Sequence, residues 1–131
     1  MMYAPLWVLA AWFTVLSAKL SFVRLLVKEG YDNHNPRDQQ ARTEGAAKRG
    51  VAAHLNGFEN FPPFASAMLF AFVTGVTSST VNVLGGAYVV SRIVYNYLYV
   101  ANFAAPRSLV WTLGSLSTIA LYISAFLKLR G

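Results

Sequence analysis

The sequence predicts an all-α integral membrane protein, a four-helix transmembrane bundle of up-down topology. Hydrophobic residues make up 56% of its 131 residues and charged residues only 12%, about half the charged share of an ordinary soluble domain. The charge is concentrated between Lys28 and Arg49, and long apolar stretches fill most of the remaining chain. Four of these stretches have the roughly 20 residues that a helix needs to cross a bilayer. They must be helical, because lipid offers no hydrogen-bond partner to the backbone of an open strand.

The four expected spans belong to a single membrane domain that covers residues 1–131. Short uncharged connections after the second and third spans place neighbouring helices antiparallel. Pro5 and Pro106 suit the first turn of a helix. The first span is interpreted as a retained helix because no basic residue precedes its apolar run, which continues past Lys19. We expect helices at about residues 5–27, 46–76, 81–103 and 106–129, and a polar loop at about 28–45 with a short helical segment near 38–41.

Lysine and arginine are unevenly shared between the two ends of the expected bundle. One end holds Lys128 and Arg130, and the other holds Lys28, Arg37, Arg42, Lys48, Arg49 and Arg107. By the positive-inside rule, the long first loop lies in the cytoplasm and both chain ends lie on the opposite side. We expect a multi-pass protein of the bacterial inner membrane, with the lipid bilayer as a partner.

Composition excludes several classes of site. The chain has no cysteine, so any thiol chemistry must use the thiol of a ligand. His34 and His54 lie too far apart in the sequence to argue for a metal site, and we expect none. The net charge of +6 comes from basic residues scattered near the membrane, not gathered on one polar face. We therefore expect no nucleic-acid partner.

Two glycines and three tryptophans are expected to serve helix packing or contact with the membrane, not ligand binding. Gly85 and Gly86 are expected to allow close approach of a neighbouring helix. Trp7, Trp12 and Trp111 are expected at the membrane interface or against lipid rather than in contact with a ligand.

The second span carries polar residues that a lipid-facing helix does not tolerate. Asn56, Glu59 and Asn60 precede Pro62 and Pro63, and the three polar residues fall on one face at helical spacing. A charged side chain at membrane depth costs about 2.5–3.5 kcal/mol on insertion scales unless it is paired. Glu59 is therefore expected to face the bundle interior, a water-filled crevice or another subunit.

The third span carries a second polar stripe. Arg92, Tyr95, Asn96 and Tyr99 recur at intervals of three, four and seven residues and therefore share one face of a helix. One interpretation is a buried ion pair between Glu59 and Arg92 that only fixes helix packing.

The other interpretation is a site for a small anionic ligand. Glu59 is the one acidic side chain within the four spans and can neutralise only one arginine. The arginines near or within the same half of the bundle are Arg24, Arg49, Arg92 and Arg107. A surplus of guanidinium groups suits a ligand with carboxylates, which guanidinium binds bidentately.

Four segments form a pattern in a fixed order along the chain. They are Val23-Arg24-Leu25, the run AHLNGFENFPPF at 53–64, the run RIVYNYLY at 92–99, and Ala105-Pro106-Arg107-Ser108. This pattern resembles that of the MAPEG family, the membrane-associated proteins in eicosanoid and glutathione metabolism, which include microsomal glutathione transferases. The resemblance spans essentially the whole chain, and its second segment is the most specific.

The resemblance implies a homotrimer of four-helix subunits that binds glutathione, as a cosubstrate, between subunits near the cytoplasmic side. Arg107 would lie near the thiol as a catalytic residue, because a nearby guanidinium favours the nucleophilic thiolate. Ser108 would be a second candidate, as a hydroxyl donor to the sulfur. The residues marked for glutathione binding, by the resemblance or by the polar stripes, are Arg24, Arg49, His54, Asn56, Glu59, Arg92, Tyr95, Asn96 and Tyr99.

The chain departs from the family pattern at two places. Val51 and Ala52 stand where some members have arginines, and Arg49 lies one helical turn earlier. The interval from Tyr99 to Arg107 is one residue shorter than in some relatives. One residue turns a helical position by about 100°.

The function implied by the resemblance is that of a glutathione-dependent membrane enzyme. It would be a transferase or peroxidase acting on lipophilic electrophiles or lipid hydroperoxides. The alternative is a non-catalytic lipid- or glutathione-binding membrane protein of the same fold. Small four-helix drug exporters are a third class, but their membrane glutamate lies in the first helix, whereas here it lies in the second.

Overall fold

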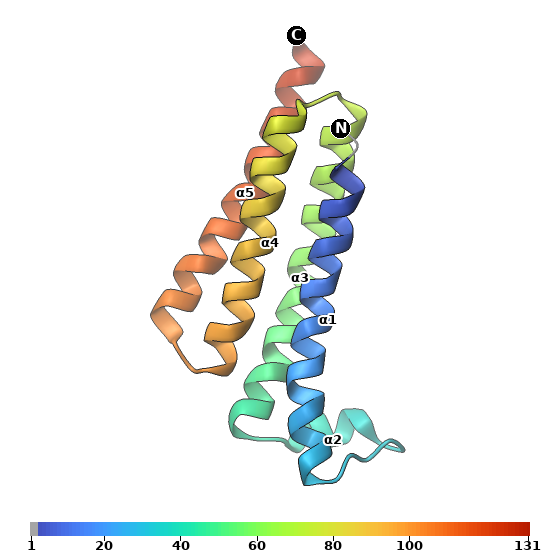
Figure 1. Cartoon of the computed structure of the whole chain (residues 1–131), viewed down its shortest axis with the longest axis vertical. Helices are drawn as coiled ribbons and strands as arrows, with labels where there is room; N and C mark the ends of the chain where they lie inside the picture. Colours follow the sequence, from blue (N-terminus) through green and yellow to red (C-terminus); the bar gives the residue numbers. More distant parts are fainter. Residues whose placement is uncertain (1–2) are drawn as a thin grey trace.

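The computed structural model describes residues 3–131, which fold into five α-helices and no strand. Four helices are long: α1 (Ala4–Glu29), α3 (Gly45–Val73), α4 (Ser78–Val100) and α5 (Ala104–Arg130). The short α2 (Pro36–Arg42) lies in the polar loop between α1 and α3 (Figure 1). The predicted helical class is confirmed, with one short loop helix in addition to the four expected spans.

The four long helices alternate in direction. α1 packs against α3 and α4, α4 also packs against α5, and α3 contacts all three of the other long helices. Figure 1 shows both termini toward one end of the molecule, and α2 and the α4–α5 turn toward the opposite end. The end with α2 is called the loop end below.

The four long helices differ in how apolar they are. α1 and α5 are long and apolar enough to cross a membrane by length and composition. α3 and α4 also exceed the roughly 20 residues that a span requires. However, these two helices hold most of the polar residues that the sequence marks for a site. Most of the polar residues expected at a site therefore lie on two helices that contact each other.

α3 and α4 both end in a Schellman motif, in which the residue after the helix cap adopts a left-handed conformation. That residue is Gly75 after α3, with φ of 75°, and Asn102 after α4, with φ of 68°. At each end, two backbone N–H groups donate to carbonyls of the last helical turn at 2.9–3.3 Å. The expected spans ran to residues 76 and 103 because apolar residues continue through both turns. The caps stop the helices three residues earlier.

α4 begins three residues before its expected start at 81. The side chain of Thr77 caps the helix, because its Oγ1 accepts a hydrogen bond from the N–H of Thr80 at 3.4 Å. Residues 78–80, which the expected spans left in the second connection, therefore form the first turn of the helix, and threonine is favoured at the cap position before it.

Asn102→Val is expected to lower the free energy of unfolding by about 1–2 kcal/mol, because a β-branched side chain is disfavoured in the left-handed conformation. Asn102→Gly is the matched control and should unfold like the wild type, since glycine adopts this conformation without strain. Thermal unfolding of the detergent-solubilised protein measures both changes. Equal stability of the valine variant and the wild type would contradict the left-handed turn.

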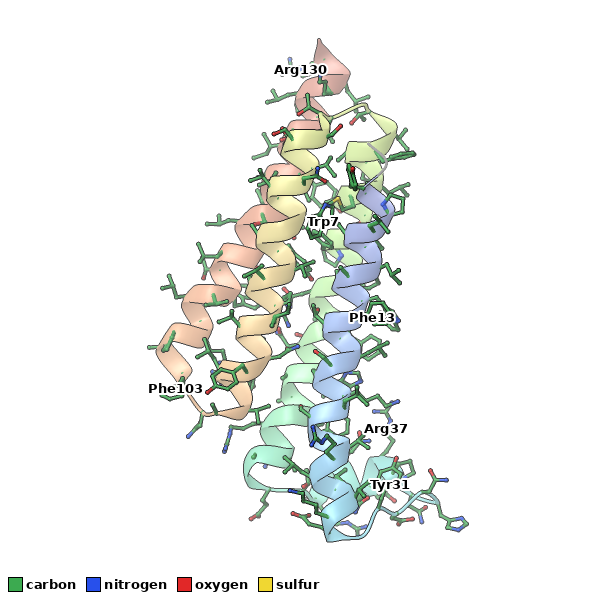
Figure 2. The ribbon with its side chains drawn as sticks, viewed as in Figure 1. Trp7, Phe13, Tyr31, Arg37, Phe103 and Arg130 are labelled. Atoms are coloured by element: carbon green, nitrogen blue, oxygen red, sulfur yellow. The ribbon has the colours of Figure 1, made fainter. Side chains whose placement is uncertain are left out.

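Close packing of α1 against α4 occurs at the end opposite the loop. Trp7 of α1 donates from Nε1 to Oδ1 of Asn82 at 2.9 Å, and Figure 2 shows Trp7 between the two helices. A Cβ added at Gly85 would come within 2.6 Å of the Trp7 ring, and one at Gly86 within 3.4 Å. The expected close approach at these glycines is confirmed, and Trp7 is a helix-joining residue rather than a purely lipid-facing one.

The loop between α1 and α2 is closed by the side chains of Asp32 and Gln39. Oδ1 of Asp32 accepts hydrogen bonds from the backbone N–H of His34 at 2.9 Å and of Asn35 at 3.0 Å. Gln39 accepts from the Asp32 N–H at 3.0 Å and donates to the Gly30 carbonyl at 2.9 Å. The bond from Asn35, followed by that from His34, holds the pKa of the Asp32 carboxyl below its usual value.

The Asp32 turn should therefore depend on pH. Because the folded-state pKa is lower than the unfolded-state value, the carboxylate stabilises the turn at neutral pH, and this contribution is lost as the pH falls through the folded-state pKa. In an NMR titration, the amide protons of His34 and Asn35 are expected to shift together with a midpoint below about 3.9. Asp32→Asn is the control without this titration. A midpoint above the usual aspartate range would contradict the turn.

Candidate functional site

A hollow of about 420 Å³ lies between α3, α4 and α5. Volumes of about 300–1,000 Å³ are typical of sites for small molecules. Its lining combines amide, phenol, guanidinium, hydroxyl and indole groups. The lining residues are Asn56 from α3, Tyr95 and Tyr99 from α4, and Arg107, Ser108, Trp111 and Thr112 from α5. The structure thus brings five of the sequence-predicted site residues together.

The lining residue Asn56 belongs to a hydrogen-bonded network of side chains on α3. Nδ2 of Asn60 donates to the backbone oxygen of Asn56 at 2.8 Å and to its Oδ1 at 3.1 Å. Nδ2 of Asn56 donates to Oε2 of Glu59 at 3.3 Å. Intervals of three and four residues place these side chains on one helix face, as the sequence predicted. The network fixes the orientation of the Asn56 amide, with its oxygen available to α4.

Arg92 of α4 is connected to this network. The side chain is only 3% exposed, and its Nη2 donates to Oδ1 of Asn56 at 3.0 Å. Within residues 3–131, Arg92 and Glu59 form no ion pair, and Asn56 lies between them in the network. The ion pair expected under the purely structural interpretation is therefore replaced by an amide bridge. Glu59 itself is exposed on the surface of the single chain.

The rest of the α4 stripe forms a row with Arg107. The Arg92 guanidinium lies over the Tyr95 ring at 4.2 Å from its centroid. The rings of Tyr95 and Tyr99 meet edge to face at 5.5 Å, and the Arg107 guanidinium lies over the Tyr99 ring at 4.1 Å. The four side chains, Arg92, Tyr95, Tyr99 and Arg107, are called the Arg–Tyr row below.

Two residues predicted to bind glutathione are directed at α1 instead of the hollow. Nδ1 of the buried His54 donates to the Val15 carbonyl at 2.9 Å. Nδ2 of Asn96 donates to the Thr14 carbonyl at 2.8 Å. Consecutive carbonyls of α1 are therefore bound by side chains of α3 and α4. His54 and Asn96 join helices in the single chain, and a ligand role for either stays a prediction.

Of three further predicted residues, Ser108 lines the hollow and the other two do not. Nε of Arg49 donates to the Val100 carbonyl at 3.0 Å and so ties the start of α3 to the end of α4. Arg24 is exposed on α1 and does not line the hollow. Ser108 does line it, while its hydroxyl donates to the Ala104 carbonyl at 3.2 Å. The ligand roles of these residues also stay predictions.

The sequence interpretation missed Trp111 and Thr112 as lining residues. Trp111 was expected at the interface or against lipid, but it lines the hollow with Thr112. Both follow Arg107 and Ser108 by four residues, so all four share one face of α5. This spacing was the available signal.

The electrostatics of the hollow favour a small anion. Arg107 lines the hollow and the buried Arg92 binds the lining residue Asn56, whereas no acidic side chain of residues 3–131 lines it. A buried charge without a charged partner is costly, and a ligand carboxylate would relieve that cost. The indole of Trp111 adds apolar surface beside the charged groups.

The sequence of the chain was compared with known families and proteins. The model of the MAPEG family matches residues 2–127, a range that includes α1 to α4 and most of α5. No curated protein and no solved structure matches the chain. The match confirms the resemblance, and the family fold is a four-helix membrane bundle. The chain therefore belongs to the MAPEG family, integral membrane proteins related to glutathione and eicosanoid metabolism.

Proposed function

We propose that the protein is a glutathione-dependent membrane enzyme, a transferase or peroxidase acting on lipophilic electrophiles or lipid hydroperoxides. The observation that supports the proposal is that the Arg107 guanidinium lines the hollow, while the buried Arg92 guanidinium donates to the neutral lining residue Asn56. Guanidinium groups bind carboxylates bidentately. Glutathione supplies carboxylates, together with the thiol that a chain without cysteine lacks.

The residues of the hollow have distinct proposed roles. Arg92 and Asn56 hold a carboxylate of glutathione, and Tyr95 orients the ligand by hydrogen bonding. Arg107 lies near the thiol and favours the thiolate, because a positive charge stabilises the ionised form. The thiolate forms a carbon–sulfur bond to an electrophile, displacing its leaving group or adding across its double bond. With a hydroperoxide, the sulfur takes the terminal oxygen as the O–O bond breaks, the alcohol leaves, and a second glutathione converts the sulfenic acid to the disulfide and water. The lipophilic substrate enters from the bilayer and meets the apolar face of Trp111.

The exposed charges on the single chain support a proposal about its assembly. Glu59 and Arg24 are exposed on the single chain, and a charged side chain facing lipid costs a few kcal/mol. We propose that further copies cover these residues in a homotrimer of the bacterial inner membrane. The basic loop end faces the cytoplasm under the positive-inside rule.

Glutathione binding by the detergent-solubilised protein tests the proposal. Calorimetry and the ultraviolet difference spectrum of the thiolate are expected to show binding, with ionised thiol at neutral pH. Arg92→Met should weaken binding by at least about 30-fold, because a buried charged hydrogen bond is worth about 2 kcal/mol or more. Arg37→Met removes the same charge from the exposed loop and should bind like the wild type.

Two other outcomes separate the alternatives. A wild-type protein that binds no glutathione would overturn the proposal. Binding without turnover of any electrophile or hydroperoxide would favour the non-catalytic glutathione-binding protein of the same fold.

A further inference from the structure

Arg107 differs from the other arginines of the site in how its guanidinium is held. Arg92 is hydrogen-bonded to Asn56 and Arg49 to the Val100 carbonyl. Within residues 3–131, by contrast, the Arg107 guanidinium makes no hydrogen bond and no ion pair. The guanidinium instead lies over the face of the Tyr99 ring, 4.1 Å from the ring centroid.

Contact with a ring face holds a guanidinium without using its N–H donors. A cation is attracted to the face of an aromatic ring by the ring quadrupole, and the planar guanidinium stacks well on it. All the N–H groups of Arg107 therefore stay available to a ligand in the hollow that Arg107 lines. A hydrogen bond to a protein carbonyl, such as that of Arg49, would occupy one of them.

The Tyr99 ring is itself held in place. Its neighbour in the Arg–Tyr row, Tyr95, is 5% exposed and meets it edge to face at 5.5 Å with an interplanar angle of 76°. This is a preferred aromatic geometry. Tyr95 in turn lies under the guanidinium of the buried Arg92. The position of Arg107 is thus linked through two rings to the buried interior of the bundle.

The turn between α4 and α5 brings Tyr99 and Arg107 together. Tyr99 lies in the last turn of α4 and Arg107 in the first turn of α5, with the left-handed Asn102 between them. The Schellman motif after α4 fixes the path of the chain over this interval. This short connection therefore brings the two side chains into contact.

We propose that Tyr99 is a positioning residue that acts through the face of its ring, holding the Arg107 guanidinium at the hollow with its donors free. The hydroxyl of Tyr99 is not required for this role. The consequence for a bound thiol rests on the proposed function, whereas the contact between the two side chains does not.

The first test needs no ligand. Tyr99→Leu and Arg107→Met are expected to lower the melting temperature of the detergent-solubilised protein by amounts whose sum exceeds the loss in the double variant, because each removes the same contact. With Tyr99→Phe in place of Tyr99→Leu, the losses should be additive with that of Arg107→Met, because the phenyl ring keeps the contact and only Arg107→Met removes it. Additive losses in the cycle with Tyr99→Leu would overturn the proposal, whatever the protein binds.

The second test measures the pKa of the glutathione thiol by ultraviolet difference titration. Tyr99→Leu is expected to raise this pKa toward that of free glutathione, with a smaller change in affinity, while Tyr99→Phe keeps it low. Tyr97→Leu is the control, since Tyr97 is 68% exposed on the same helix and does not line the hollow. A high thiol pKa in Tyr99→Phe would show that the hydroxyl acts, and a low one in Tyr99→Leu that the ring is dispensable; either overturns the proposal. If the wild type binds no glutathione, the proposed function fails, and the coupling test decides the role of Tyr99 alone.

Discussion

Arg107→Ala is expected to reduce turnover by about 10²–10³-fold, the usual effect of removing one group that stabilises developing negative charge. The reason is that Arg107 is the arginine that lines the hollow with its guanidinium free of hydrogen bonds within residues 3–131. Glutathione affinity should fall much less, because Arg92 and Asn56 still hold a carboxylate. The measurement is steady-state turnover of a lipophilic electrophile and of a hydroperoxide, alongside calorimetry.

The control for this variant is Arg37→Ala. It removes an equal charge from the exposed loop, where Arg37 bonds only to Gln40 among residues 3–131. Unchanged turnover in Arg107→Ala would show that this guanidinium does not activate the thiol. A loss of affinity as large as the loss of turnover would instead assign Arg107 to ligand binding.

Gly85→Ala is expected to lower the free energy of unfolding by about 1–3 kcal/mol through overpacking. An added Cβ would lie 2.6 Å from both the Trp7 ring and the Met68 side chain, which press on Gly85 from α1 and α3. Alanine favours a helix over glycine by up to about 1 kcal/mol, so the packing effect must exceed this gain. Thermal unfolding in detergent measures the difference.

The neighbouring Gly86→Ala provides a matched control. Its added Cβ would lie 3.4 Å from the Trp7 ring, an ordinary contact. The same change one residue later should therefore be neutral or stabilising, because the propensity gain is then unopposed. If both variants melt at the wild-type temperature, the α1–α4 approach is looser than the structure indicates.

The long helices could be predicted from the sequence because each contains a largely apolar stretch of the length that a span requires. Their ends could not be predicted from hydropathy. Residues 74–76 and 101–103 include apolar side chains that continue the pattern, while the stop comes from left-handed Gly75 and Asn102. A glycine or asparagine shortly after an apolar helix is the sequence signal for such a cap, and both were present.

The site was predictable within single helices but not between them. The spacing on α4 correctly placed Arg92, Tyr95 and Tyr99 together. Tyr95 and Asn96 differ by about 100° around the helix, and this difference sends Asn96 to α1 while Tyr95 lines the hollow. The rotation of α4 about its axis decides which of its polar side chains contact α1 and which line the hollow. Sequence spacing does not determine that rotation.

The hydrogen-bond partner of Arg92 in the structure differs from the one that charge predicted. Opposite charges suggested Glu59, but Glu59 is exposed at the outer edge of the α3 network. Asn56 lies three residues earlier on the same face and presents its oxygen to Arg92 at 3.0 Å. Counting charges does not reveal Asn56 as the partner of Arg92, because an amide is neutral. Its oxygen can accept from a guanidinium while its NH2 group donates to a carboxylate.

The amide bridge between Arg92 and Glu59 also links the thermal behaviour of the protein to its surroundings. Within residues 3–131, the buried Arg92 donates to the neutral Asn56 and to no carboxylate. An anion that binds the folded protein but not the unfolded chain would therefore raise the free energy of unfolding. The gain grows with the logarithm of ligand concentration and reaches about 2.7 kcal/mol at a hundredfold excess over Kd. For an anion that binds in the hollow as proposed, the melting temperature of this membrane protein is expected to rise with the concentration of that anion.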